Sequence, residues 1–185
     1  SWPDFNSDHL IVSSKEMLDI EGRIFSAGLP IPALMERAGY SITHWLLNQP
    51  GLIDSGVLVL VGPGHNGGDG LVVARELHHL GVEVFIWSPF KKQKPLTASH
   101  LAYAKWIGVN QVKGCPNPDG KELWVEAFFG IGQSRPLPDS IQELFKQREQ
   151  KQPGRLISID VPAGICSDSG TSFQENSAKA SFTLT

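Results

Sequence analysis

The chain has 185 residues, of which 41% are hydrophobic and 19% are charged, a composition suited to one globular domain with a complete core. Its formal net charge of -3 gives no overall attraction to a phosphate backbone, so nucleic acid is a poor first candidate for a partner. Two distant cysteines make no disulfide framework or zinc motif, and no apolar run or signal peptide suggests membrane insertion or export, so we expect a cytoplasmic protein.

The amino-terminal part is predicted to be helical before any sheet begins. Residues 1–12 form a polar lead-in, and residues 13–185 are expected to form one domain. Ser13 and Glu16 have the spacing of a capping box, which opens a helix, and apolar residues follow at helical intervals. A second helix is predicted over residues 32–48, because its apolar residues also recur with helical spacing.

From residue 57 onward, strand patterns and helix patterns alternate. Strands are predicted at 57–61, 82–87, 108–112, 123–128 and 156–159, and helices at 69–80, 98–107 and 141–148. This alternation predicts an α/β fold with a parallel sheet that is covered on both faces. Residues 182–185 resemble a further strand with no polar tail behind it, which leads us to expect a domain that is truncated at its carboxyl end.

The strongest chemical signal is the glycine-rich segment at residues 61–70, between a predicted strand and a helix. Ligands of parallel sheets bind at this edge, where glycines let backbone amides approach a phosphate closely. Gly62, Gly64 and Gly67 match G-x-G-x-x-G, yet no acid ends the next strand to hold a ribose, and no Gly-Lys-Ser/Thr follows. Ordinary NAD dehydrogenases and phosphate-loop NTPases are therefore disfavoured. A turn that only packs a helix against a strand stays open as an alternative.

Two further loops carry polar residues at predicted strand ends. Residues 129–137 combine glycines with Ser134 and Arg135 before a helix start, a composition suited to an anionic group. Asp160 ends an apolar strand, where a buried carboxylate needs partners and where active sites of parallel sheets lie. The alternatives are a solvated Arg135 and an Asp160 that only orders the next turn. Three such loops at one sheet edge favour a binding site.

Other polar clusters carry less weight. His78 and His79 lie on a predicted helix without further ligands near them, so we interpret them as surface or rim residues. Lys91, Lys92 and Lys94 form a short basic loop, which we interpret as solvated rather than as a binding patch. None of these side chains carries a functional prediction.

The segments at residues 62–70, 129–137 and 159–164 together resemble the YjeF N-terminal domain family, the NAD(P)H-hydrate epimerases. Glu21 and residues 34–39 also follow this family's pattern, and the resemblance covers nearly the whole chain. It implies a Rossmann-like three-layer α/β/α sandwich with a mainly parallel sheet, usually as a homodimer. It also implies interconversion of the R and S hydrates of NADH or NADPH, so that a dehydratase specific for the S form can repair both. In longer chains an ADP/ATP-dependent dehydratase domain can follow.

The resemblance also assigns roles to individual residues of this chain. The residues expected to contact the hydrated dinucleotide are His65, Asn66, Gly67, Gly68, Asp69, Gly130, Ile131, Gly132, Gln133, Ser134, Arg135, Pro136 and Asp160. A potassium ion is expected at Asn66, Glu126 and Ala163, although the family usually has Asp and Ser at the last two positions. Asp160 is the expected catalytic residue: it would protonate the departing C6 hydroxyl and accept a proton from the incoming water.

Two other functions compete with this prediction. The first is a non-catalytic dinucleotide-binding or scaffold module of the same fold, which tight binding without turnover would favour. The second is another nucleotide-dependent enzyme, such as a dehydrogenase or a kinase, which the missing ribose acid and missing lysine disfavour. The sequence leaves open whether NADH hydrate or NADPH hydrate is preferred.

Overall fold

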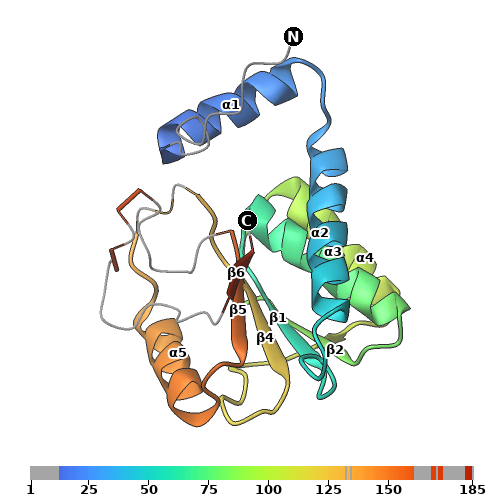
Figure 1. Ribbon diagram of the computed structural model, residues 1–185, viewed down its shortest axis with the longest axis vertical. Helices are drawn as coiled ribbons and strands as arrows, with labels where there is room; N and C mark the ends of the chain where they lie inside the picture. The colour runs from blue at the N-terminus through green and yellow to red at the C-terminus, as the bar shows by residue number, and fades with distance from the viewer. Residues whose placement is uncertain are drawn as a thin grey trace.

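The structure is a computed structural model that describes residues 13–131, 133, 135–160, 168–169, 171–172 and 182–184. These residues form five helices and a six-stranded sheet (Figure 1). The helices are α1 (Ser14–Ser26), α2 (Ile31–Leu47), α3 (His65–His79), α4 (Pro95–Trp106) and α5 (Asp139–Lys151). The strands are β1 (Val57–Val61), β2 (Val84–Trp87), β3 (Asn110–Gln111), β4 (Leu123–Ala127), β5 (Leu156–Ile159) and β6 (Phe182–Leu184). The lead-in at residues 1–12 lies outside the described residues.

All six strands run parallel, in the order β3-β2-β1-β4-β5-β6. The chain moves outward from β1 to β3 and then returns to the other side of β1 at β4. The loops that follow β1 and β4 therefore leave the sheet in opposite directions, and such a switch in strand order opens a crevice at the carboxyl ends of the strands. The predicted α/β fold is confirmed, and this crevice lies between two of the glycine-bearing loops.

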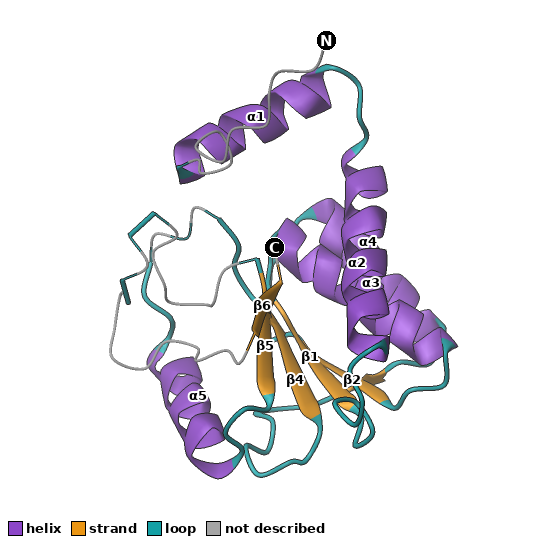
Figure 2. Cartoon of the chain, in the orientation of Figure 1, coloured by secondary structure: helices purple, strands orange, loops and turns teal. Residues whose placement is uncertain are grey.

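Helices cover both faces of the sheet (Figure 2). Alternate residues of β1 point to opposite faces, so that Val57, Val59 and Val61 belong to the apolar cluster that includes residues of α3. Leu58 and Leu60 belong to the second cluster, which contains the apolar side of α5. All five β1 residues are buried, as the unbroken apolar run predicted. The result is a three-layer sandwich in which α2, α3 and α4 lie on one face and α5 on the other.

Helix α1 lies apart from this sandwich (Figure 1). It begins with the predicted capping box: the Glu16 amide donates to Ser13 Oγ at 3.3 Å, and the Ser13 amide donates to Glu16 Oε2 at 2.7 Å. None of its residues is buried. Its position therefore does not come from the core that holds the other helices.

The prediction that Gly67 and Gly68 belong to a loop was wrong, because α3 begins four residues earlier than the predicted 69–80, at His65. A Cβ atom on Gly67 would lie 2.1 Å from the carbonyl oxygen of Gly62. The missing side chains let the first turn of α3 approach the end of β1. Tertiary packing here outweighs the low intrinsic helix propensity of glycine.

Other boundaries differ by one to three residues, and α5, predicted over residues 141–148, extends over Asp139–Lys151. Helix α4 starts at Pro95 rather than at residue 98, since proline has a backbone angle suited to the first helical position. Strand β2 begins at Val84, and β3 is confined to Asn110–Gln111 at the edge of the sheet. Among the described residues, no helix combines the length and hydropathy that a membrane span requires.

Candidate functional site

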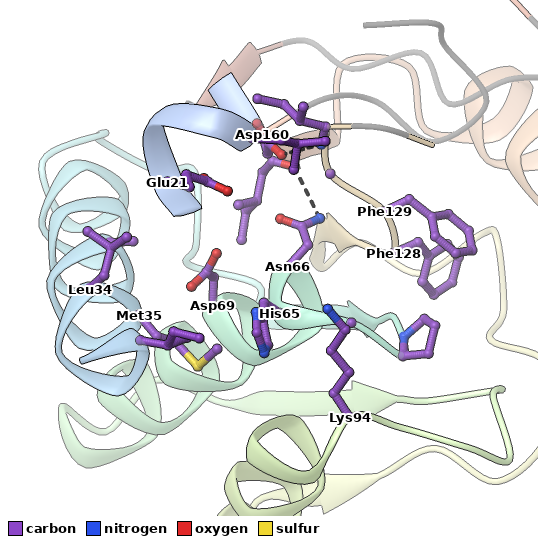
Figure 3. A pocket seen from close by; sticks show the side chains of 18 of the residues that line it. Glu21, Leu34, Met35, His65, Asn66, Asp69, Lys94, Phe128, Phe129 and Asp160 are labelled. Atoms are coloured by element: carbon purple, nitrogen blue, oxygen red, sulfur yellow. Dashed lines mark hydrogen bonds between the residues drawn. The ribbon is translucent and has the colours of Figure 1, made fainter. Parts of the chain in front are cut away.

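A cavity of about 530 Å³ lies at the carboxyl ends of β1, β4 and β5 (Figure 3). Its walls come from the loop after β1, the first turn of α3, the loop after β4 and the end of β5. Apolar residues of α1 and α2 close another side, among them Leu18, Phe25 and Leu34. Small-molecule sites commonly have volumes of roughly 300–1,000 Å³, so this cavity is large enough for an organic ligand.

The cavity brings together members of all three predicted loops. The predicted contact residues that line it are His65, Asn66, Asp69, Gly130, Ile131 and Asp160. Gly67 and Gly68 are buried behind its wall, Gln133 is half-buried, and Arg135 and Pro136 are exposed; none of these five lines the cavity. Gly132 and Ser134 lie outside the described residues. The three loops therefore meet as predicted, while the arginine end of the second loop lies away from the cavity.

The glycines of the first loop have two different roles. A Cβ atom on Gly62 would lie 1.8 Å from the carbonyl oxygen of Phe128, and one on Gly67 would lie 2.1 Å from the Gly62 carbonyl oxygen. These two glycines allow close packing, which was the alternative interpretation of the motif. Gly64 lines the cavity, and a Cβ atom added to it would meet nothing within 4 Å, so its backbone is accessible to a ligand.

Asp160 has an unusual backbone conformation at the mouth of β5. Its φ of 69° is the only positive value for a non-glycine residue among the described residues. The Asp160 amide donates to the carbonyl oxygen of Leu184 at 2.6 Å, and its Oδ2 atom accepts from the Ile131 amide at 2.6 Å. Burial raises the pKa of Asp160, while the Ile131 hydrogen bond acts in the opposite direction. A left-handed residue held at a cavity is a candidate functional position, because the surrounding structure must stabilise that conformation.

Two further carboxyl groups lie near Asp160 (Figure 3). Burial, and then the charges of Asp160 and Glu21, raise the pKa of Asp69 to about 7. Burial and the Asp160 charge also raise the pKa of Glu21 on α1. The described residues provide the Asp69 carboxyl group with no hydrogen bond or ion pair. This acidic cluster, Glu21, Asp69 and Asp160, therefore contains a carboxyl group that exchanges its proton near neutral pH.

Asn66 adds a buried polar group that has an unused acceptor. Its side chain is 9% exposed, and Nδ2 donates to the carbonyl oxygen of Ile159 at 3.4 Å. Oδ1 has no partner among the described residues. Figure 3 shows this oxygen turned toward the side of the cavity where Glu21 and Asp69 lie. Because an unpaired buried acceptor is costly, its position suggests a polar ligand or an ion.

The interpretation of the basic loop missed one residue of the site. Lys94 lines the cavity, whereas Lys91 and Lys92 are exposed and lie away from it. The signal that could have found Lys94 is the proline that follows it. Pro95 at a helix start places Lys94 at the N-cap, and helices that follow strands of a parallel sheet begin at the ligand-binding edge.

Comparison with known proteins agrees with the predicted resemblance. The family model described as YjeF-related protein N-terminus matches residues 32–185. The chain belongs to this family. A bifunctional NAD(P)H-hydrate repair enzyme Nnr from Thermosynechococcus vestitus is 44% identical over 161 residues, which are 86% of this chain and 32% of that protein. An NAD(P)H-hydrate epimerase from Anopheles darlingi is 30% identical over 159 residues, which are 83% of this chain and 69% of that protein.

A solved structure has the same overall fold as this chain. The crystal structure of yeast YNL200c matches 94% of this chain and 78% of its own length, with a TM-score of 0.79 and 24% identity. The predicted Rossmann-like sandwich is therefore confirmed. This chain spans about a third of the length of the bifunctional repair enzymes it matches.

Of the predicted potassium ligands in this YjeF N-terminal domain, Asn66 is better placed to bind an ion than Glu126. Glu126 is fully buried; its Oε1 atom accepts from the Phe128 amide at 2.7 Å, and its Oε2 atom accepts from Ser158 Oγ at 2.8 Å. Ala163 lies outside the described residues, which contain no group of three His, Cys, Asp or Glu side chains arranged to hold a metal. The unused oxygen of Asn66 fits an ion, whereas both Glu126 oxygens already accept hydrogen bonds from the protein.

Proposed function

We propose that this domain is an NAD(P)H-hydrate epimerase that interconverts the R and S hydrates of NADH or NADPH in the cytoplasm. The observation that carries the proposal is Asp160, a half-buried carboxyl in a left-handed conformation at a ligand-sized cavity, where the strand order of the sheet switches. The names of the relatives support the reaction class. They do not indicate which of the two hydrates is preferred.

The substrate determines what chemistry the site must perform. The hydrate carries a hydroxyl group on C6, next to the ring nitrogen N1. When Asp160 donates its proton to that hydroxyl, the C6–O bond breaks, water leaves and the ring becomes a cation delocalised onto N1. A water molecule then adds to the opposite face of C6 and gives its proton to the Asp160 carboxylate. General acid–base catalysis of this kind contributes roughly 10²–10⁴-fold.

The acidic cluster supports both halves of this reaction. The raised pKa of Asp160 favours the protonated form that the first half requires. The cation that forms next would lie beside Glu21 and Asp69, where charge interactions are stronger than in water because the site is partly buried. Asp160 is therefore the proposed acid and base, and its two neighbours stabilise the intermediate.

We also propose a potassium ion, a homodimer and a further domain. Potassium is supported by the unused Asn66 oxygen, and a bound ion would supply positive charge next to the acidic cluster. A homodimer rests on the family resemblance. A carboxyl-terminal ADP/ATP-dependent dehydratase domain in the full-length chain is supported by the repair enzymes, which extend far beyond the matched part.

The test is the conversion of R-NADPH hydrate to the S form by purified protein, followed by chromatography. Asp160→Asn is the informative variant, because Asn tolerates positive φ better than Ala and so preserves the strained backbone. Asp54→Asn is the matched control, since Asp54 is exposed and does not line the cavity. We expect Asp160→Asn to lower kcat by roughly 100-fold or more and the control to retain full activity.

Two outcomes would contradict the proposal. Full activity of Asp160→Asn would remove Asp160 from the mechanism. Tight binding of the hydrate by the folded wild-type protein without any acceleration, also in the full-length chain, would favour the non-catalytic binding module instead.

A further inference from the structure

Acidic and basic side chains line different sides of the cavity. The acidic cluster lies on one side, and Lys94 is the only lysine or arginine among the described residues that line the cavity. Figure 3 shows the Lys94 side chain extending from the start of α4 to a position beside His65, on the opposite side of the cavity from Glu21 and Asp160. Burial, and then the nearby Lys94 ammonium group, lower the pKa of His65, which agrees with this proximity.

The backbone of Lys94 is fixed to the loop after β1. Its amide donates to the carbonyl oxygen of Pro63 at 2.8 Å. One turn further, Thr97 is fully buried, and its Oγ1 atom donates to the carbonyl oxygen of Gly64 at 2.7 Å. These two hydrogen bonds hold the start of α4 against the start of α3, so that Lys94 remains at the cavity.

The ammonium group of Lys94 has no counter-charge in the described part of the chain, where no ion pair or hydrogen bond involves it. Lys94 is the N-cap of α4, and its backbone is bonded to Pro63, two residues before α3, so the amino ends of both helices add partial positive charge near it. Gly64 leaves open space at the same place. The unpaired Asn66 oxygen lies across the cavity, on the side of Glu21 and Asp69, so the space beside Lys94 and Gly64 is lined by donors.

We propose that Lys94 binds a phosphate group of the substrate and thereby directs the hydrated nicotinamide ring to the acidic cluster. The charges favour this orientation over its reverse. A phosphate beside Glu21, Asp69 and Asp160 would be repelled, and a ring cation beside Lys94 would be destabilised. The orientation of the ring rests on the proposed function, whereas phosphate binding by Lys94 does not depend on turnover.

The kinetic test compares Lys94→Gln with Lys92→Gln. Lys92 lies on the same loop, is exposed and does not line the cavity, so it controls for loss of one positive charge. A charge-assisted hydrogen bond predicts a rise of about tenfold in KM for R-NADPH hydrate in Lys94→Gln, with kcat within about twofold. Lys94→Arg should restore most of the affinity. An unchanged KM in Lys94→Gln, or an equal rise in Lys92→Gln, would overturn the proposal.

A binding test separates this inference from the proposed reaction. Inorganic pyrophosphate is titrated into wild type, Lys94→Gln and Lys92→Gln by calorimetry, without any turnover. Weaker binding in Lys94→Gln alone supports the inference, even if the wild type shows no epimerase activity and the proposed function fails. Equal pyrophosphate binding by all three proteins refutes the role of Lys94, even if the epimerase activity is present.

Discussion

The two ends of the cavity lie at the same edge of the sheet. The charged groups of the acidic cluster are partly buried, whereas the charged group at the other end, Lys94, is exposed. At the acidic end, Asp69 and Asp160 are partly buried, and burial is the main reason that the pKa of each is raised. At the other end, Lys94 is exposed and unpaired by any described residue. Burial changes the chemistry of a charged group, whereas an exposed charge mainly attracts. We therefore expect catalysis to depend on the first end and affinity on the second.

The backbone shows the same contrast. Asp160 has a left-handed conformation, and a Cβ atom on Gly130 would lie 2.2 Å from its Oδ2 atom. Lys94 is an ordinary N-cap residue before a helix, with φ of -60°. The addition of one methyl group should therefore disturb the acidic end of the cavity much more than the end at which Lys94 lies.

The largest expected effect among the tests of this contrast is that of Gly130→Ala. The added methyl group would displace the Asp160 carboxyl from the Ile131 amide, so kcat should fall by roughly 100-fold, the lower range for loss of acid–base catalysis. The measurement is steady-state epimerisation together with a thermal melt. Gly22→Ala, where an added Cβ meets nothing within 4 Å, is the control. Equal kcat for both variants would show that Gly130 does not position Asp160.

A second effect concerns stability. The pKa of Asp69 is about 7 in the folded protein against an ordinary 3.8, so the folded state binds a proton that the unfolded state releases above about pH 4. The free energy of unfolding should therefore fall as pH rises from about 4 to 7. Asp69→Asn removes this loss and should be more stable than wild type at pH 8, by an amount on the order of 2–4 kcal/mol.

Urea unfolding at pH 5 and pH 8 measures this effect. The gap between Asp69→Asn and wild type should widen toward pH 8, because the wild-type carboxyl then has to ionise inside the fold. The same gap at both pH values would mean that Asp69 titrates near its ordinary pKa.

A smaller effect is expected for Glu21→Gln. The Glu21 charge raises the pKa of Asp69 less than burial and the Asp160 charge do, so removing the Glu21 charge should lower that pKa only partly. The fall in the free energy of unfolding with rising pH should therefore end at a lower pH in Glu21→Gln than in wild type. Asp19→Asn is the control on the same helix, since Asp19 forms an exposed ion pair with Arg23 and does not line the cavity. Equal pH profiles for the two variants would place Glu21 outside the acidic cluster.

The smallest expected effect is that of potassium. Adding potassium chloride to protein in choline chloride should raise the melting temperature by about 2–4 °C, the shift for roughly 1 kcal/mol in a domain of this size. Asn66→Leu should abolish the response, because the unused oxygen is lost. The same shift in both proteins would mean that no ion binds at Asn66.

Local patterns predicted most of the fold. Strands β1 and β5 have the predicted bounds, because an unbroken apolar run between turn residues is a local signal of a buried strand. The first turn of α3 was missed, since its glycines oppose helix formation locally and are required only by contacts with Gly62. Lys94 was missed for a similar reason: its neighbours in sequence are solvated lysines, while its neighbours in space are cavity residues.

The sequence by itself determined the succession of helices and strands and the three loops at one sheet edge, because periodicity and turn residues act over a few positions. Only the tertiary structure decided that Glu21, Asp69 and Asp160 share one cavity and that Lys94 opposes them. It also decided that Ser158 and the Phe128 amide donate to the Glu126 carboxylate. These relations join segments far apart along the chain, and their energies depend on burial, which arises only when the layers pack together.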